Sequence, residues 1–238
     1  MLTTVFFDLY GTLAGFAPSR YLVQSEACAE FGIELSPEGV LAGYALADAF
    51  MARENSVSPL RTKDPEEKEK FFAEYERLVL QGSGVEVEKD IAARIWERVR
   101  QVPYDLALFD DVVPTLRTLK ERGLRLGMLS NMDRKGSDLA AHLGLAEFLD
   151  SAVTSSEVSI EKPHAGIFLA ALERAGASAE ESVHVGDQPT SDVEGALGVG
   201  MQAVLLDRDG NHEGYERCPR IESLSELADV LESMRTGA

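Results

Sequence analysis

The sequence predicts an α/β protein, with a parallel sheet as its core and an all-helical segment inserted near the beginning of the chain. Three observations support this fold class. The predicted first strand, Leu2–Phe7, holds a continuous apolar run at Val5–Phe7 and is followed by Asp8, as expected for a parallel strand that is buried on both faces. Residues 14–106 contain no such run and repeat apolar side chains at helical spacing instead. After residue 106, short apolar strands alternate with helices, which is typical of a parallel sheet covered on both faces.

The change from strand spacing to helical spacing predicts two domains. We assign residues 1–13 and 107–238 to the α/β core, and residues 14–106 to a helical cap. Loops are expected at residues 55–64 and 81–84, where polar and turn-forming residues gather. The predicted cap helices share apolar side chains at steps of three and four residues, and they are Arg20–Phe31, Pro37–Arg53, Pro65–Gln81 and Glu88–Arg100.

The core resumes after the cap with alternating elements. The expected strands are Leu124–Ser130, Ser151–Thr154, Ser182–Val185 and Gln202–Leu206. The expected helices are Asp111–Arg122, Lys135–Leu143, Ala165–Ala175, Ser191–Leu197 and Leu224–Met234, and a polar loop is expected at residues 207–220. Glycine follows three of these helices, at Gly123, Gly144 and Gly176, where it commonly ends a helix. The positions of these glycines support the predicted ends of the three helices.

Charge and cysteine content restrict the partners and the compartment. The 238 residues include 41 acidic and 23 basic side chains, which gives a formal net charge of −18. Such a surface repels phosphate backbones and anionic lipid, so we expect no nucleic acid and no membrane as a partner. A small anionic substrate would need a locally positive pocket. The two cysteines, Cys28 and Cys218, lie far apart in no ligand-spaced pattern, and they favour a reducing, cytoplasmic environment.

Polar side chains stand at the carboxyl ends of the predicted strands. In chain order they are Asp8, Ser130 with Asn131, Lys162, and Asp187 with Asp192. A parallel sheet brings these strand ends to one edge, where open α/β sheets bind ligands. The set combines a candidate nucleophile, a hydroxyl donor, a cation and a pair of carboxylates. The four histidines, His142, His164, His184 and His212, show no ligand spacing and are expected to be ordinary core or surface residues.

The segments that carry these residues resemble the four motifs of the haloacid dehalogenase superfamily. In the order of that superfamily they are Asp8–Leu13, Leu129–Asn131, Glu161–Pro163 with Ile167 and Phe168, and Gly186–Asp192 with Gly195 and Ala196. The resemblance covers essentially the whole chain and implies a Rossmann-like parallel sheet core. The position of the insertion resembles the subfamily whose cap follows the first motif.

The residue types suit the chemistry that the resemblance implies. Asp8 would be a carboxylate nucleophile that forms a covalent aspartyl intermediate. The Ser130 hydroxyl, together with the backbone amides of Gly11 and Thr12, could donate hydrogen bonds to the oxygens of a transferring group. Lys162 would supply positive charge between the anionic nucleophile and an anionic substrate. These residues form the expected catalytic and substrate-binding set, to which we add Tyr10 and Asn131.

A magnesium site is expected beside the nucleophile. Asp8 and Asp187 form an oxygen-only ligand set of the kind that Mg²⁺ prefers. Asp192 would be a further ligand or would orient the others. The resemblance implies that Tyr10 can contribute its backbone carbonyl to the same ion. Mg²⁺ is therefore the expected cofactor.

Tyr10 leaves more than one function open. Phosphatases of the superfamily carry a second aspartate at this position as general acid and base, whereas its 2-haloacid dehalogenases carry a tyrosine. The other motifs favour phosphoryl chemistry, because a metal-free dehalogenase has no need of Asp187. We therefore expect a Mg²⁺-dependent phosphatase acting on a small phosphorylated metabolite through an aspartyl-phosphate at Asp8. The alternatives are a metal-independent 2-haloacid dehalogenase with an ester intermediate at Asp8, and a low-activity binding module on the same fold.

Overall fold

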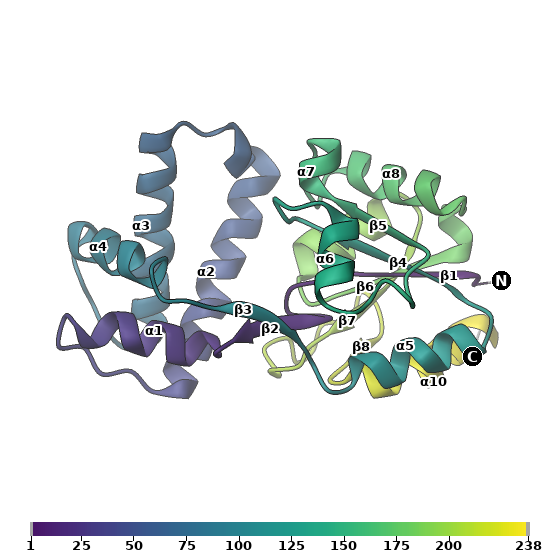
Figure 1. Cartoon of the computed structure of the whole chain (residues 1–238), viewed down its shortest axis with the longest axis horizontal. Coiled ribbons are helices and arrows are strands. Elements are labelled where there is room, and N and C mark those ends of the chain that lie inside the picture. Colours follow the sequence, from purple (N-terminus) through teal and green to yellow (C-terminus); the bar gives the residue numbers. More distant parts are fainter. Residues whose placement is uncertain (1, 237–238) are drawn as a thin grey trace. The chain divides into compact units, whose positions relative to one another are not determined.

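A parallel sheet organises the larger part of the chain. The computed structural model describes residues 2–236, and the chain divides into two compact units, Met1–Gly15 with Ala107–Ala238, and Phe16–Leu106. The first unit holds a six-stranded sheet in the order β5-β4-β1-β6-β7-β8, whose strands all pair in parallel (Figure 1). This arrangement confirms the predicted α/β class.

The strands of this sheet are β1 (Thr4–Phe7), β4 (Arg125–Ser130), β5 (Ser151–Thr154), β6 (Ser182–Gly186), β7 (Gln202–Leu206) and β8 (Arg220–Ile221). In the middle of the sheet, β1 lies between β4 and β6, with Phe7 opposite Met128 on one side and Val185 on the other. All four residues of β1 are buried, because neighbouring strands and helices surround it. The short strand β8 was not predicted, since the sequence there reads as the end of a polar loop.

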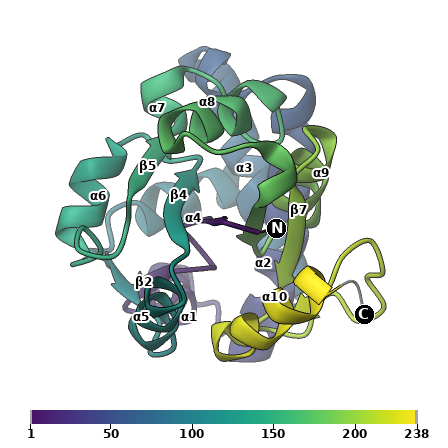
Figure 2. The same ribbon diagram turned by 90° about the vertical axis from the view of Figure 1, so that its right-hand side faces the viewer.

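Helices cover both faces of the sheet. They are α5 (Val112–Glu121), α6 (Gly136–His142), α7 (Ser155–Val158), α8 (Ala165–Ala175), α9 (Gly195–Gly198) and α10 (Leu227–Thr236). Figure 2 shows α8 and α9 on one face of the sheet, and α5 with α10 on the other. Under α8 the core is apolar, with Phe6 and Leu129 from the sheet packed beside Phe168 and Leu172 from the helix. The central strand β1 is thus held by hydrogen bonds to its two neighbouring strands and by apolar contacts with α8.

An irregular turn replaces the start of the helix predicted at Ser191–Leu197. Residues Pro189–Glu194 form a π-helix, and α9 begins only at Gly195. The backbone N–H of Val193 donates to the carbonyl of Gln188, which is the wide spacing of a π-helical turn. Such turns are frequent at functional sites. This one directly follows β6 at the carboxyl edge of the sheet.

Two short strands lie where the chain passes between the two units. β2 (Ala14–Ala17) and β3 (Asp105–Leu108) pair with each other in a separate two-stranded sheet. The sequence did not predict this pair, because four residues are too few to show a strand period. On the core side of this pair, the Phe109 N–H donates to the Leu13 carbonyl at 3.2 Å. The outgoing and returning segments are therefore tied together within the core unit.

The second unit is helical. It contains α1 (Arg20–Ala29), α2 (Pro37–Val57), α3 (Pro65–Gly82) and α4 (Lys89–Val99), with a short 3₁₀ turn at Leu60–Thr62. Helix α3 begins with a capping box, in which Asp64 and Glu67 each accept a backbone N–H of the other. Helix α2 extends four residues past its predicted end at Arg53, into a stretch that reads as loop. None of the helices in residues 2–236 has the length and apolar composition needed to cross a membrane.

A buried polar network lies inside the helical unit. The Gln24 side chain donates to Glu76 Oε1 and to the Cys28 sulfur, and it accepts from the Tyr44 hydroxyl at 3.2 Å. Glu76 is fully buried, and its Oε2 has no hydrogen-bond partner among the described residues. Burial raises the pKa of Glu76 to about 8, and the hydrogen bond from Gln24 opposes this only in part. The carboxyl group is therefore protonated in the folded protein at neutral pH.

We expect Glu76 to make the stability of the protein fall as the pH rises. Between the ordinary glutamate pKa of 4.5 and the raised value of about 8, the folded state binds a proton that the unfolded state has released. The free energy of unfolding should therefore decrease across this window, by an amount on the order of a few kcal/mol. Glu76→Gln should flatten the decrease, as measured by urea unfolding at pH 5 and pH 8. Glu69→Gln, at an exposed position of the same helix, should leave it unchanged, and equal curves for both variants would contradict the assignment.

Candidate active site

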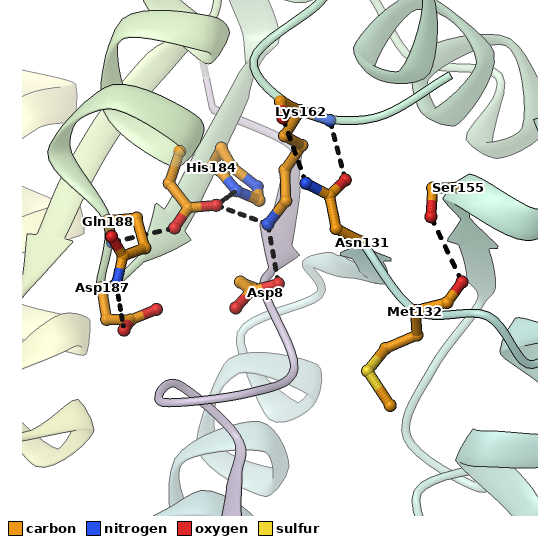
Figure 3. Close-up of polar contacts among 9 residues, drawn as sticks. Asp8, Asn131, Met132, Ser155, Lys162, His184, Asp187 and Gln188 are labelled. Atoms are coloured by element: carbon orange, nitrogen blue, oxygen red, sulfur yellow. Dashed lines mark hydrogen bonds and ion pairs between the residues drawn. The ribbon is translucent and has the colours of Figure 1, made fainter. Parts of the chain in front are cut away.

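The carboxyl edge of the sheet brings charged residues from distant segments together. Asp8 directly follows β1, Asp187 directly follows β6, and Asp192 lies in the π-helical turn. Lys162 comes from the loop between α7 and α8 and reaches the other residues from above the strand ends (Figure 3). Asp8 and Asp187 leave the backbone where a strand ends, so the parallel pairing of β1 and β6 places them side by side.

Lys162 forms two buried ion pairs at the centre of the site. Its Nζ lies 2.7 Å from Asp8 Oδ1 and 2.5 Å from Asp192 Oδ1, and only 3% of the lysine is exposed. Burial would lower the pKa of Lys162, but the two carboxylates outweigh burial and raise it above its usual range. The ammonium group is therefore permanently charged.

The two carboxylates differ in their electrostatics. Burial raises the pKa of Asp8, Lys162 opposes this rise, and the negative charge of Asp192 adds to it. Burial would also raise the pKa of Asp192, but Lys162 and the hydrogen bond with His184 hold it well below its usual range. Asp192 is thus a fixed anion, whereas the charge of Asp8 depends on its cationic neighbours.

Both oxygens of Asp192 are engaged. Its Oδ1 lies within hydrogen-bond distance of Lys162 Nζ and of His184 Nε2, the latter at 2.9 Å. Its Oδ2 accepts the backbone N–H of Gln188 at 3.0 Å. Asp8, by contrast, is bound only through Oδ1, and its Oδ2 makes no hydrogen bond among residues 2–236.

Asn131 holds the backbone of Lys162. Its Oδ1 accepts the Lys162 N–H at 2.7 Å, and its Nδ2 donates to the Lys162 carbonyl at 3.1 Å. Both ends of the Asn131 amide thus hold the lysine loop, and its expected role in substrate binding stays a prediction. Ser130, one residue earlier, is buried at the end of β4. The two neighbouring residues therefore differ in their contacts: Asn131 fixes the lysine loop, and Ser130 lies at the strand end.

The loop after Asp8 closes on itself. The Gly11 N–H donates to the Ala14 carbonyl at 2.8 Å, and the N–H groups of Leu13 and Ala14 both donate to the Leu9 carbonyl. The Gly11 amide is therefore not a donor for a ligand, contrary to the sequence-based expectation. The Thr12 N–H makes no hydrogen bond among the described residues, and Thr12 Oγ1 is buried without a partner there. The Thr12 N–H is therefore available to donate to a ligand.

Gly11 also allows Asp187 to approach the loop. It has a φ of +81°, and a Cβ atom on it would lie 2.4 Å from Asp187 Oδ2. The carboxylate of Asp187 therefore occupies the space that any other residue at position 11 would fill. Gln188 Nε2 donates to the same oxygen at 3.2 Å. The first and fourth motif segments are in this way packed directly against each other.

The acidic residues of the site could hold a divalent cation. Asp8, Asp187 and Asp192 each offer one ligand atom, and these atoms all lie within 4.8 Å of one another. Carboxylate oxygens are hard ligands of the kind that Mg²⁺ prefers. The fit is supported by Gly11, which keeps the Asp187 carboxylate close to Asp8, and by the raised pKa of Asp8, whose charge a bound cation would offset.

Sequence reasoning missed two residues that support the site. His184, expected to be ordinary, contacts Asp192 from within β6. Arg208, in a stretch expected to be a polar loop, donates from Nη2 to the Thr12 carbonyl at 2.9 Å and pairs through both terminal nitrogens with Asp111. Arg208 lies two residues past the end of β7, so the search at strand ends that identified Asp8 would also have found it. No comparable signal marks His184.

We expect Gly11→Ala to destabilise the protein more than a matched glycine substitution does. Gly123 also has a positive φ, +78°, but no atom lies within 4 Å of a Cβ built on it. Both substitutions carry the backbone penalty of about 1–2 kcal/mol for a left-handed conformation. Gly11→Ala adds the contact with Asp187, worth a further ~1–3 kcal/mol by the usual cost of overpacking. Urea unfolding of both variants would measure the difference, and equal losses would contradict the close approach.

Comparisons with known proteins agree on one family. The family model described as haloacid dehalogenase-like hydrolase matches residues 2–200. A glyceraldehyde 3-phosphate phosphatase from Methanothermobacter thermautotrophicus is 37% identical, over 52% of this chain and 58% of its own length. A ribulose-1,5-bisphosphate 5-phosphatase from Halopiger xanaduensis is 27% identical, over 97% of this chain and 100% of its own. The chain spans about half the length of the first of these relatives.

Two solved structures share the fold. A 2-haloacid dehalogenase from Pseudomonas syringae superimposes with a TM-score of 0.59 at 27% identity, covering 98% of this chain and 100% of its own. A magnesium-bound HAD-hydrolase from Bacillus subtilis has a TM-score of 0.66 at 19% identity, covering 97% of this chain and 99% of its own, and shows the fold alone.

Proposed function

The chain belongs to the haloacid dehalogenase-like hydrolase family, and on this premise we propose that it is a Mg²⁺-dependent phosphatase of a small phosphorylated metabolite. The observation that carries the proposal is the buried contact of Lys162 with Asp8, beside a carboxylate of Asp187 packed on Gly11. This arrangement offers a nucleophile, a fixed cation and a place for a divalent ion. The names of the two phosphatase relatives support the same substrate class.

In the proposed reaction, Asp8 attacks phosphorus through the oxygen that Lys162 does not hold. A bond forms between Oδ2 and phosphorus, the bond from phosphorus to the ester oxygen breaks, and the leaving group departs with its electron pair. Water then attacks the phosphorus of the aspartyl-phosphate, the bond between phosphorus and Oδ2 breaks, and the carboxylate of Asp8 is restored as phosphate leaves. The proton that water loses goes to the solvent, from which the leaving group takes its own proton. Lys162 stays within 2.7 Å of Oδ1 and lowers the repulsion between two anions.

The remaining residues of the site have separate proposed roles. Ser130 and the Thr12 N–H are the proposed donors to the phosphoryl oxygens, because the Gly11 amide is already used. Asp8, Asp187 and the backbone carbonyl of Tyr10 are the proposed ligands of Mg²⁺. Asp192, which was expected in the same set, is proposed to orient Lys162 instead, since both its oxygens accept other donors. When bound, the ion would neutralise charge on the phosphoryl group.

The compartment and partners follow from the surface and the thiols. We propose a cytoplasmic protein that binds a small anionic substrate and neither nucleic acid nor membrane. Both cysteines are free thiols, and the net charge of −18 disfavours polyanionic partners.

Dehalogenation is the second candidate, and Tyr10 is the residue that favours it. Similarity to the Pseudomonas syringae dehalogenase is compatible with it as well. The acidic cluster speaks against it, because Asp187 and Asp192 add negative charge beside a nucleophile that would have to attack a haloacid anion unaided by a metal. We therefore retain the phosphatase proposal.

We expect the protein to hydrolyse p-nitrophenyl phosphate in the presence of Mg²⁺ and to lose this activity in EDTA. Asp8→Asn should lower the rate by at least about 10³-fold, because it removes the nucleophile. Asp209→Asn changes an exposed aspartate that follows the carboxyl end of β7, and it should leave the rate unchanged. Activity that persists in EDTA would contradict the metal requirement. Halide release from 2-chloropropionate, without phosphate release from the ester, would favour the dehalogenase.

We further expect Tyr10→Asp to increase the hydrolysis of alkyl phosphates more than that of aryl phosphates. An alkoxide leaves poorly without a proton, and a positioned acid typically contributes about 10²–10⁴-fold to such a step. A phenolate leaves without this help. The ratio of the two rates, measured for the original chain and for the variant, tests the idea. An equal increase for both substrate types would mean that the missing acid does not limit the reaction.

A further inference from the structure

A buried histidine lies directly behind the ion pairs of the site. His184 is in the middle of β6, opposite Phe6 of β1 and Ala203 of β7. Its side chain is fully buried, and its ring packs edge-on against Phe168 with 5.5 Å between the centroids. A polar ring in such a place loses its hydration, so its few hydrogen bonds determine what it can do.

The hydrogen bonds assign the position of the proton on this ring. Nε2 is 2.9 Å from Asp192 Oδ1, and an ionised carboxylate only accepts, so Nε2 is the donor. Nδ1 is buried without a hydrogen-bond partner among residues 2–236. A proton there would be a buried donor without an acceptor, which is costly. The ring therefore donates from Nε2 to Asp192.

Asp192 in turn decides where the ammonium of Lys162 lies. Its Oδ1 accepts hydrogen bonds from both Lys162 Nζ and His184 Nε2. The same Nζ also contacts Asp8 (Figure 3). We propose that His184 is a positioning residue, whose hydrogen bond to Asp192 keeps Lys162 shared between Asp192 and the nucleophile Asp8. The kinetic meaning of this role rests on the proposed phosphatase function.

Competition between the two donors explains the effect. While His184 occupies part of Asp192 Oδ1, this oxygen binds Lys162 less strongly than a carboxylate with a single donor would. Without His184, Asp192 Oδ1 would accept only the hydrogen bond from Lys162. It would attract Nζ more strongly and draw it away from Asp8. The nucleophile would then lose the counter-charge that Lys162 supplies at 2.7 Å from Asp8 Oδ1.

The test compares variants that differ in the donor alone. His184→Leu and His184→Met remove the N–H and keep an apolar side chain of comparable size, so that one of them can replace the other if it does not fold. His184→Gln keeps an N–H at a similar reach. Phe168→Leu is the packing control, because it removes the ring contact and leaves the hydrogen bond to Asp192 in place. Thermal unfolding by circular dichroism monitors folding in every variant.

Kinetics on p-nitrophenyl phosphate with Mg²⁺ give the first readout. We expect kcat to fall by about 10–100-fold in His184→Leu and His184→Met, as is usual when a residue that orients a site residue is lost, with KM nearly unchanged. His184→Gln should recover most of the rate, and Phe168→Leu should keep it. A loss of kcat in Phe168→Leu as large as in His184→Leu would overturn the proposal, because packing would then explain both.

The second readout does not depend on turnover. The ¹⁵N–¹H signal of the Lys162 ammonium, identified by its absence in Lys162→Met, should shift in His184→Leu and return in His184→Gln. A chain that hydrolyses no phosphate ester would refute the proposed function, yet this shift would still uphold the positioning role. A Lys162 signal that is identical in the Leu and Gln variants would overturn the positioning role, whatever the activity.

Discussion

One ammonium group between two buried carboxylates sets the demands that the rest of the structure meets. Three charges cannot leave water unless they pair closely, and removing one partner would leave another stranded. Lys162 reaches both Asp8 and Asp192 because Asn131 fixes its backbone and because β1 and β6 are neighbours in the sheet. The apolar packing of the central strands thus offsets the free-energy cost of burying charged residues at their ends, and it fixes the positions of those residues.

Topology accounts for the part of the site that the sequence could predict. Asp8 and Asp187 follow apolar runs, and parallel pairing then places them together without any knowledge of side-chain contacts. The sheet was predictable for the same reason, since buried strands appear as uninterrupted apolar runs. The short strands β2, β3 and β8 were not predictable, because their few residues carry no period and their pairing depends on partners far along the chain.

Hydrogen bonds account for the part that could not be predicted. The Gly11 amide and the Asn131 side chain suit a ligand in composition, but neighbouring carbonyl and N–H groups use them first. His184 stands between two valines in a buried strand, so its sequence surroundings resemble those of any core segment. Its role becomes visible only in the hydrogen bond with Asp192, eight residues later. A regular helix predicted over this stretch would miss the wide turn that brings Asp192 back onto the Gln188 N–H.

The hydrogen bonds of Arg208 also bear on which parts of the chain can change without altering the loop that follows the nucleophile. Arg208 binds the Thr12 carbonyl and Asp111, while the Phe109 N–H binds the Leu13 carbonyl, so both attachment points of the inserted segment are secured within the core itself. The nucleophile loop therefore does not rely on the insertion for its shape. A change in the length or sequence of the intervening helices would leave these hydrogen bonds of the core in place.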